Sequence, residues 1–441
     1  MTETFLQRIS RLNPTLNAFI TITDDEALDQ AKQACKLLRR RPHALLLGVP
    51  LALKDVFATK GIRTTCGSKI LERNVPTYDA STVRMLKDSG AVMLGKLNLH
   101  EFALGTTSEN PHYGPARNPW DLRMISGGSS GGSAVAVASS LCLGSLGTDT
   151  GGSIRIPASL CGIVGLKPTY GRVSRFGVFP LSWTQDHVGI LSRTVEDASL
   201  ILRTIAGKDP KDPTTSDLQV PDYPSDLADM PQRIRVAILK ENLSEADDEV
   251  QKAFFRATEE LEDEGVSLTE VSFSLVDYAR AINFIVMACE GYSIHEYHLK
   301  KRESDYGSDV RDRLMQGKLI TARDYLKAQR LRSYITHEIR TLLKRFDLLV
   351  TPTTPITATP IGSTNLEVKG KNKIVRTLLP IFTRLYNVTG LPAISVPCGF
   401  SGKGLPIGLQ IAGRPFEEGL ILKAAYRYEH RTKWYRRHPK L

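Results

Sequence analysis

Apolar and polar positions follow two patterns that alternate along most of the chain. Short, nearly continuous apolar runs such as residues 45–53 are typical of buried strands. Segments with apolar positions every three or four residues, such as 81–89 and 247–264, are typical of amphipathic helices. Because the two kinds of segment follow one another almost from end to end, the sequence predicts a layered α/β fold. Further strands are expected at 91–95, 233–239, 348–350 and 406–411, and a last helix at 417–428.

One segment interrupts this alternation. Residues 208–232 are rich in Pro, Asp and Ser and show little periodicity, which predicts a long surface connection. Such a connection can separate two domains or bridge two halves of one sheet. The hydrophobic pattern allows both arrangements.

Composition narrows the class of protein. The chain has 441 residues, of which 41% are hydrophobic and 24% charged, as in ordinary globular proteins. No apolar run reaches the roughly 18 residues of a membrane span, and the first residues lack the pattern of a secretory signal. We therefore expect a cytoplasmic protein that is not a membrane protein. The six cysteines form no Cys-x-x-Cys pair and the nine histidines no His-Glu-x-x-His cluster, so we expect no metal and no other cofactor.

The formal net charge of +11 raises the question of a nucleic-acid partner. Basic residues gather at 39–41 and at 427–440, and aromatic side chains are interleaved with the second group. This combination occurs in RNA-binding surfaces. It also occurs in solvated helices and basic tails, and no RNA-binding motif accompanies the charge here. We expect a solvated surface and no nucleic-acid partner.

The strongest chemical signal is a pair of glycine- and serine-rich segments at residues 126–133 and 147–153. Glycine in such numbers disfavours helix and strand interiors but permits tight turns and a close approach of backbone to a ligand. The second segment runs into a helix-like stretch with an early proline, Pro157. Backbone N–H groups at such a loop-to-helix junction favour a developing negative charge, as in an oxyanion hole.

Other uses of glycine-rich loops fit less well. A phosphate-binding loop requires a lysine after its glycines, and none follows here. The spacing of dinucleotide-binding glycines is also absent. A Gly-x-Ser-x-Gly nucleophile elbow fails because residues 128–131 have the wrong spacing around their serines. A purely structural turn gives no reason for two serine–glycine clusters so close together.

Residues 127–167 resemble the signature block of the amidase signature family. That family includes fatty acid amide hydrolases, peptide and malonamide amidases, urethane-cleaving enzymes and the glutamine-hydrolysing subunit of tRNA amidotransferases. The resemblance also covers segments near both ends of the chain, at residues 11–14, 48–55 and 390–397.

The resemblance implies an amidase signature fold, in which a large mixed β-sheet lies between α-helices. We expect one such domain over residues 1–441. Its signature core would span about 45–200, and a helical region at about 275–345 would contribute to the substrate pocket.

The resemblance also assigns roles by position. Ser153 matches the nucleophile, Ser129 the bridging serine whose preceding peptide bond is cis, and Lys54 the base. The oxyanion donors are expected to be four backbone N–H groups, those of Thr150, Gly151, Gly152 and Ser153. Three further positions match residues that support the loop: Ser130, Asp149 and Arg155.

These roles are chemically sensible. A serine hydroxyl is too weakly acidic to attack an amide unaided and needs an adjacent base. A lysine is a base only when neutral, and burial lowers its pKa. Lys54 follows the apolar residues 49–53, which would carry its stem into the interior. The alternatives for Lys54 are an ion pair with Asp55 and simple exposure.

The sequence departs from the family at the position that distinguishes glutamine. A glutamine site needs an arginine for the α-carboxylate, which Arg313 matches, and an acidic group for the α-amine. Pro380 stands near the place of that acidic residue, with Phe382 close by. An ammonium group would lack its partner there, and charge-built sites discriminate strongly on this point. We expect Arg313, Pro380 and Phe382 to line the substrate pocket.

The sequence therefore predicts a serine hydrolase, working as a monomer or homodimer. It would cleave the C–N bond of small amides, such as aryl or alkyl amides, anilides or carbamates (as a urethanase does), through an acyl-enzyme. One alternative is a glutamine-hydrolysing subunit that supplies ammonia to a partner. An alternative of another class is a non-catalytic, RNA-associated assembly protein with the same fold.

Overall fold

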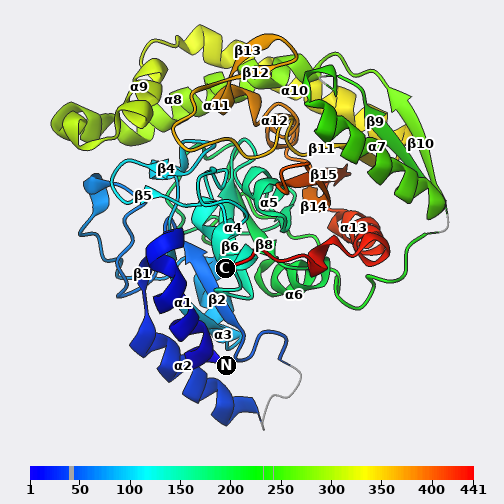
Figure 1. The fold of residues 1–441 in the computed structure, drawn as a ribbon. Coiled ribbons are helices and arrows are strands. Elements are labelled where there is room, and N and C mark those ends of the chain that lie inside the picture. Colours follow the sequence, from blue (N-terminus) through cyan, green and yellow to red (C-terminus); the bar gives the residue numbers. More distant parts are fainter. Residues whose placement is uncertain (39–43, 232, 242) are drawn as a thin grey trace.

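The computed structural model describes residues 1–38, 44–231, 233–241 and 243–441, so the basic run at 39–41 lies outside the described residues. An 11-stranded mixed sheet runs through the molecule, with helices on both faces (Figure 1). This confirms the predicted α/β fold with a large mixed sheet. The strands, in their order across the sheet, are β1 (Phe19–Ile22), β3 (Val92–Leu97), β2 (Pro50–Lys54), β6 (Gly144–Asp149), β8 (His187–Ser192), β7 (Val164–Lys167), β14 (Ala393–Phe400), β15 (Pro406–Gly413), β11 (Leu348–Pro352), β9 (Ile234–Leu239) and β10 (Val266–Val271).

Strand direction changes across the sheet. β2 runs parallel to β3 and to β6, and β9 runs parallel to β10 and to β11. The strands between these two parallel groups pair antiparallel, from β6 through β8, β7, β14 and β15 to β11. Because β2 and β6 are parallel neighbours, their C-terminal ends lie side by side.

The helices follow the predicted alternation. Those of the first half are α1 (Thr2–Leu16), α2 (Asp24–Leu38), α3 (Ser81–Asp88), α4 (Gly131–Ala138), α5 (Arg155–Cys161) and α6 (Val195–Ile205). Those of the second half are α7 (Asp248–Asp263), α8 (Val276–Arg302), α9 (Ser308–Gly317), α10 (Ala322–Arg345), α11 (Val375–Leu378), α12 (Arg384–Val388) and α13 (Glu418–Thr432). Figure 1 shows α8, α9 and α10 together at one end of the molecule and α1 and α2 at the other.

Side chains of one strand pack alternately on the two faces of the sheet. In β3, Val92 and Leu94 belong to a core cluster with residues of α1, α2 and α4. Met93, between them, belongs to the cluster that holds residues of α3 and α6. This alternation follows from the two-residue period of a strand, and burial on both faces explains the nearly continuous apolar runs.

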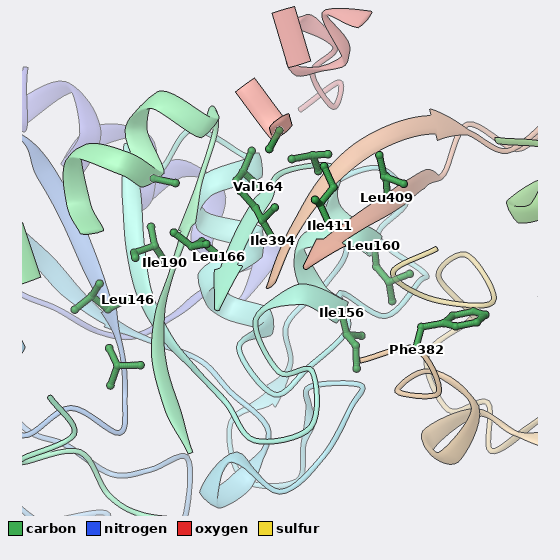
Figure 2. Packing of buried hydrophobic residues seen from close by; sticks show 14 of the residues in the cluster. Leu146, Ile156, Leu160, Val164, Leu166, Ile190, Phe382, Ile394, Leu409 and Ile411 are labelled. Carbon is green, nitrogen blue, oxygen red and sulfur yellow. The ribbon is translucent and has the colours of Figure 1, made fainter. Parts of the chain in front are cut away.

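The centre of the core lies between the middle strands and α5. Figure 2 shows Leu146, Ile190, Leu166 and Ile394 on neighbouring strands, with Ile156 of α5 beside them. All five side chains are almost fully buried. The first glycine-rich segment continues into α4, which packs in the other core cluster, and the second links β6 to α5. These packed helices fix where both segments end.

Element boundaries differ from the prediction where turns intervene. The expected strand at 45–53 begins only at Pro50, because residues 44–49 form turns and Gly48 has a φ of 76°. Between α6 and β9, the described part of the segment 208–232 contains no helix or strand. Tyr223 and Leu227 nevertheless pack into the core and hold this connection on the surface.

Candidate active site

Strand pairing places Lys54 beside Thr148. Lys54 is the last residue of β2, and the parallel register sets Leu53 opposite Leu146 of β6. The Lys54 Nζ atom donates to Thr148 Oγ1 at 2.8 Å and to Ser129 Oγ at 2.8 Å. Lys54 is fully buried, so its amine lies between two hydroxyl groups and away from water.

Burial lowers the pKa of Lys54 to about 7, although the charges of Asp149 and Asp186 act in the opposite direction. Neither carboxylate forms an ion pair with the amine. The neighbouring Asp55 pairs with Lys96 at 3.0 Å, so the simple alternative of a Lys54–Asp55 ion pair is wrong. Within the described part of the chain the polar partners of the Lys54 amine are hydroxyls, and such a buried lysine is suited to accept a proton near neutral pH.

The loop before α4 brings Ser129 to this amine. The peptide bond between Gly128 and Ser129 is cis, as the family resemblance implies. The Ser129 carbonyl accepts from the His100 N–H at 3.1 Å and from Ser108 Oγ at 3.2 Å. These contacts hold the fully buried Ser129 in place beneath the loop.

Ser130 connects the first glycine-rich loop to the second. Its N–H donates to the Ser153 carbonyl at 3.1 Å, and its hydroxyl donates to the Thr148 carbonyl at 3.2 Å. Ser130, the residue after Ser129, is therefore bonded to the backbone carbonyls of both Ser153 and Thr148. Ser153 is 8% exposed, and its hydroxyl makes no hydrogen bond to any described residue.

The loop before α5 is organised by the Asp149 carboxylate. Its oxygens accept from the N–H groups of Gly152 at 2.8 Å and Ile154 at 3.1 Å. The N–H of Gly152 is thus engaged within the loop. On the other side, the Thr150 carbonyl accepts from Asn283 Nδ2 at 2.9 Å.

Gly152 is required for this loop shape. Its φ is 127°, a region that L side chains rarely adopt. A Cβ at this position would lie 2.3 Å from Thr383 Oγ1. The same Thr383 hydroxyl donates to the Gly151 carbonyl at 2.7 Å, so the α12 segment is packed directly on the loop.

Arg155 holds the loop from beneath. Its guanidinium pairs with Asp149 at 2.9 Å and is fully buried. It also donates to residues of the C-terminal part of the chain, namely Thr383, Asn387 and Gln410. Burial acts to raise the pKa of Asp149, but the charge of Arg155 outweighs it and holds that pKa well below its usual range. Asp149 is therefore a permanent anion that shapes the loop.

Asp186 lies on the opposite side of Thr150. It accepts from Thr150 Oγ1 at 2.6 Å and from the N–H groups of Leu181 and Ser182, each at 2.9 Å. Burial raises its pKa to about 6. Asp186 therefore titrates close to the range in which Lys54 does.

A cavity of about 240 Å³ opens beside these groups. Its wall includes Thr148, which bonds the Lys54 amine, and Thr150 and Asp186. The rest of the wall is mostly apolar and aromatic, with Phe176, Val178, Phe179, Pro180, Leu181 and Trp183 among its residues. Such a lining suits a small ligand with a largely apolar body.

The three residues expected to line the substrate pocket lie in different surroundings. Arg313 forms an ion pair with Asp309, and the Asp309 carboxylate also pairs with Arg376 at 2.7 Å. Pro380 is buried in the turn before α12. Phe382 is only 3% exposed and lies in the core near Ile156 (Figure 2), which leaves it little surface to offer a substrate.

Several residues at the site carry no signal in the sequence. Thr148 contacts the lysine only because β2 and β6 are parallel neighbours, which no local pattern reveals. Asn283 lies within the helical region expected at the pocket, but nothing in the pattern marks it. The ion pair of Asp309 with Arg313 was readable, since positions four apart on a helix are neighbours.

Two further findings concern the described residues alone. They contain no group of three or more His, Cys, Asp or Glu side chains that could hold a metal ion. Nor do the helices among them include one that is long and apolar enough to cross a membrane.

Comparison with known proteins places this chain in a family. The family model described as Amidase matches residues 1–422. The A subunit of the glutamyl-tRNA(Gln) amidotransferase of Geotalea daltonii is 42% identical over 461 residues, covering 99% of this chain and 94% of that protein.

Two solved structures extend the likeness. A structure described as a vestigial protein complex that reveals the evolutionary origins of an s-triazine catabolic enzyme has a TM-score of 0.94 and 36% identity and covers 100% of this chain and 96% of that chain. The 6-aminohexanoate cyclic dimer hydrolase with its substrate has a TM-score of 0.90 and 28% identity, covering 100% and 95%. The chain therefore belongs to the amidase family and is a hydrolase of carbon–nitrogen bonds.

Proposed function

We propose that the protein cleaves small amides through an acyl-enzyme, with Ser153 as nucleophile, Ser129 as proton bridge and Lys54 as base. The observation that carries this proposal is the buried Lys54 amine, 2.8 Å from Ser129 Oγ. A pKa of about 7 leaves a large fraction of this amine neutral at physiological pH.

The proton path follows from this geometry. Ser153 Oγ attacks the amide carbon, its proton passes to Ser129 Oγ, and the Ser129 proton passes to Lys54 Nζ. When the C–N bond breaks, the proton returns along the same path to the leaving nitrogen. Water then attacks the Ser153 ester and gives a proton to Lys54 through Ser129; as the ester C–O bond breaks, that proton returns to Ser153 Oγ and the acid product leaves. Lys54 thus acts as a general base during the attack and, once protonated, as a general acid when the amine leaves.

The oxygen of the tetrahedral intermediate needs donors that are free to receive it. The Gly152 N–H already donates to Asp149 at 2.8 Å. We therefore assign the main donor role to the N–H groups of Gly151 and Ser153, with Thr150 next in the loop. The Gly151 N–H shares a peptide plane with the Thr150 carbonyl, which accepts from Asn283 Nδ2 at 2.9 Å. The Ser153 N–H shares one with the Gly152 carbonyl, which accepts from the Ile156 N–H at 2.8 Å, so the direction of both donors is fixed.

The substrates proposed are small aryl or alkyl amides, anilides or carbamates. The mostly apolar wall of the cavity near Thr148 supports an apolar group on one side of the scissile bond. Pro380, in place of the acidic residue expected for glutamine, leaves an α-ammonium group without a partner.

A second candidate function is glutamine hydrolysis that feeds ammonia to a partner protein. The observation that favours it is the 42% identity with the A subunit of an amidotransferase over almost the whole chain. Pro380 speaks against it for the reason just given. A Pro380→Asp variant supplies the missing carboxylate, so a gain of glutaminase activity in that variant would attribute the difference to this position.

The test is a hydrolysis panel with the purified protein. It contains alkyl amides, aryl amides, anilides, carbamates and glutamine, and Ser153→Ala serves as the control. Release of amine or ammonia from the non-glutamine amides, absent in Ser153→Ala, supports the first function. Full turnover in Ser153→Ala contradicts the proposed nucleophile, and turnover of glutamine alone supports the second candidate.

A further inference from the structure

Thr383, which packs on the nucleophile loop, is followed by an arginine, Arg384. Thr383 Oγ1 donates to the Gly151 carbonyl at 2.7 Å, so the start of α12 lies against the loop. A Cβ placed on Gly151 would lie 3.8 Å from the Arg384 Cγ and 3.1 Å from Asn283 Oδ1. The side chains of Asn283 and Arg384 therefore lie against the Gly151 α-carbon, next to the proposed oxyanion donors.

Arg384 has no anionic partner. Its side chain makes no hydrogen bond and no ion pair anywhere in the part of the chain that the structure describes. It is nevertheless partly buried. A partly buried charge without a partner loses some of its hydration, and an anionic ligand can offset that loss.

The charges of two more arginines act on Arg384. Burial, together with the charges of Arg280 and Arg313, lowers the pKa of Arg384 to about 10. Arg280 lies three residues before Asn283 on α8, and hence on the same side of that helix. The Arg313 guanidinium pairs with the Asp309 carboxylate, and Arg280 Nη2 lies 3.8 Å from Glu245 Oε1. The uncompensated charge is that of Arg384.

From this we propose that Arg384 binds an anionic group, a carboxylate, on the acyl part of the substrate, and that the preferred substrates are monoamides of short dicarboxylic acids. The proposal rests on the proposed amidase function and narrows its substrate class. An arginine can grip a carboxylate with two parallel N–H donors, which fixes orientation as well as charge. Since Pro380 has no carboxylate, an ammonium group next to the substrate's carboxylate, as in glutamine, would form no ion pair there and would not strengthen binding.

The test compares matched pairs of amides. Succinamate is paired with 4-methylpentanamide, and glutaramate with 5-methylhexanamide, because an isopropyl group has nearly the shape of a carboxylate. We expect the wild-type enzyme to favour the charged member of the better pair by about 10- to 100-fold in kcat/KM, the range of one or two charge-assisted hydrogen bonds. Glutaramate should also be a better substrate than glutamine.

Variants then assign this preference to Arg384. In Arg384→Met the charged-to-neutral ratio should fall to near one, mainly through KM, and Arg384→Lys should restore part of it. Arg330→Met removes the same charge from an exposed position of α10 and should keep the wild-type ratio. An unchanged ratio in a folded Arg384→Met protein, or a wild-type preference for the neutral amides, overturns the proposal.

Inhibition by product gives a reading that needs no stable variant. Succinate or glutarate should inhibit the wild-type enzyme at lower concentration than 4-methylpentanoate, and equal inhibition argues against Arg384 as the carboxylate site. The two levels of proposal also fail differently. An enzyme that cleaves neutral amides but not their charged partners retains the proposed function and loses only this inference. A protein that cleaves none of them loses the proposed function.

Discussion

The amine nitrogen of Lys54 lies 2.8 Å from the hydroxyl oxygen of Ser129. This contact joins a strand end of the sheet to the loop before α4, two parts of the chain that are 75 residues apart. Because no carboxylate among the described residues pairs with this amine, the protonation state of Lys54 can change near neutral pH. The first three predictions concern this pair and the charge next to it.

Lys54→Met should abolish most activity while leaving the protein folded. Methionine is similar in length and apolar, and a positioned general base contributes about 10²- to 10⁴-fold to rate. We therefore expect kcat to fall by about that factor. Removing a desolvated amine should leave the midpoint of thermal unfolding unchanged or raise it. A large fall of the thermal midpoint would instead mean that Lys54 mainly stabilises the fold.

The pH dependence of kcat/KM should show an ascending limb with an apparent pKa of about 7. Below that pH the Lys54 amine is protonated and cannot accept the serine proton, so the rate falls about tenfold for each further pH unit. Initial rates between pH 5 and pH 9 on a neutral amide measure this limb. A flat profile across pH 6 to 8 would exclude a lysine with so low a pKa as the base.

Asp186→Asn should move that limb to lower pH. The negative charge of Asp186 acts to raise the pKa of Lys54, so its removal lowers that pKa further. Asparagine can keep one of the acceptor contacts with Leu181 and Ser182. The same pH series on this variant measures the shift. Movement of the limb to higher pH contradicts the electrostatic link, and a thermal unfolding curve checks that the fold survives.

Arg155→Met should lower the free energy of unfolding more than the same substitution of any exposed arginine. The change leaves Asp149 as a buried carboxylate without its cation, and breaking a buried pair costs about 3–5 kcal/mol. Arg235 is the matched control, because it also pairs with an aspartate, Asp347, but is half exposed. Urea unfolding of both variants gives the comparison. Equal losses would show that the buried network contributes no special stability.

The fold was largely predictable because burial leaves a strong pattern. The predicted helices at 81–89 and 247–264 match α3 and α7 to within a residue at each end. Both have a regular apolar stripe, and α7 also has an N-cap, Asp247, whose side chain accepts from the Glu249 N–H, whereas α3 follows Ala80 without a side-chain cap. The strand predicted at 45–53 was too long at its start, since the apolar Leu45 and Leu47 lie in turns rather than in the sheet.

Only those parts of the site that are formed by residues close together in the sequence could be predicted. The glycine-rich loops mark Ser129 and Ser153 in the sequence, and the structure brings their loops together through Ser130. Contacts that depend on strand order or helix packing leave no local trace. Thr148 and Arg384 belong to this group, because each reaches the site through a neighbour distant in sequence.

The buried guanidinium of Arg155 joins residues of one early loop to Thr383, Asn387 and Gln410. During synthesis the ribosome releases the nucleophile loop more than 200 residues before the last of these partners, the separation being 255 for Gln410. A nascent chain therefore holds all three proposed catalytic residues long before it can support their geometry. We therefore expect the nascent chain to gain activity only at the end of translation, and proteolytic fragments that lack the C-terminal fifth to be inactive.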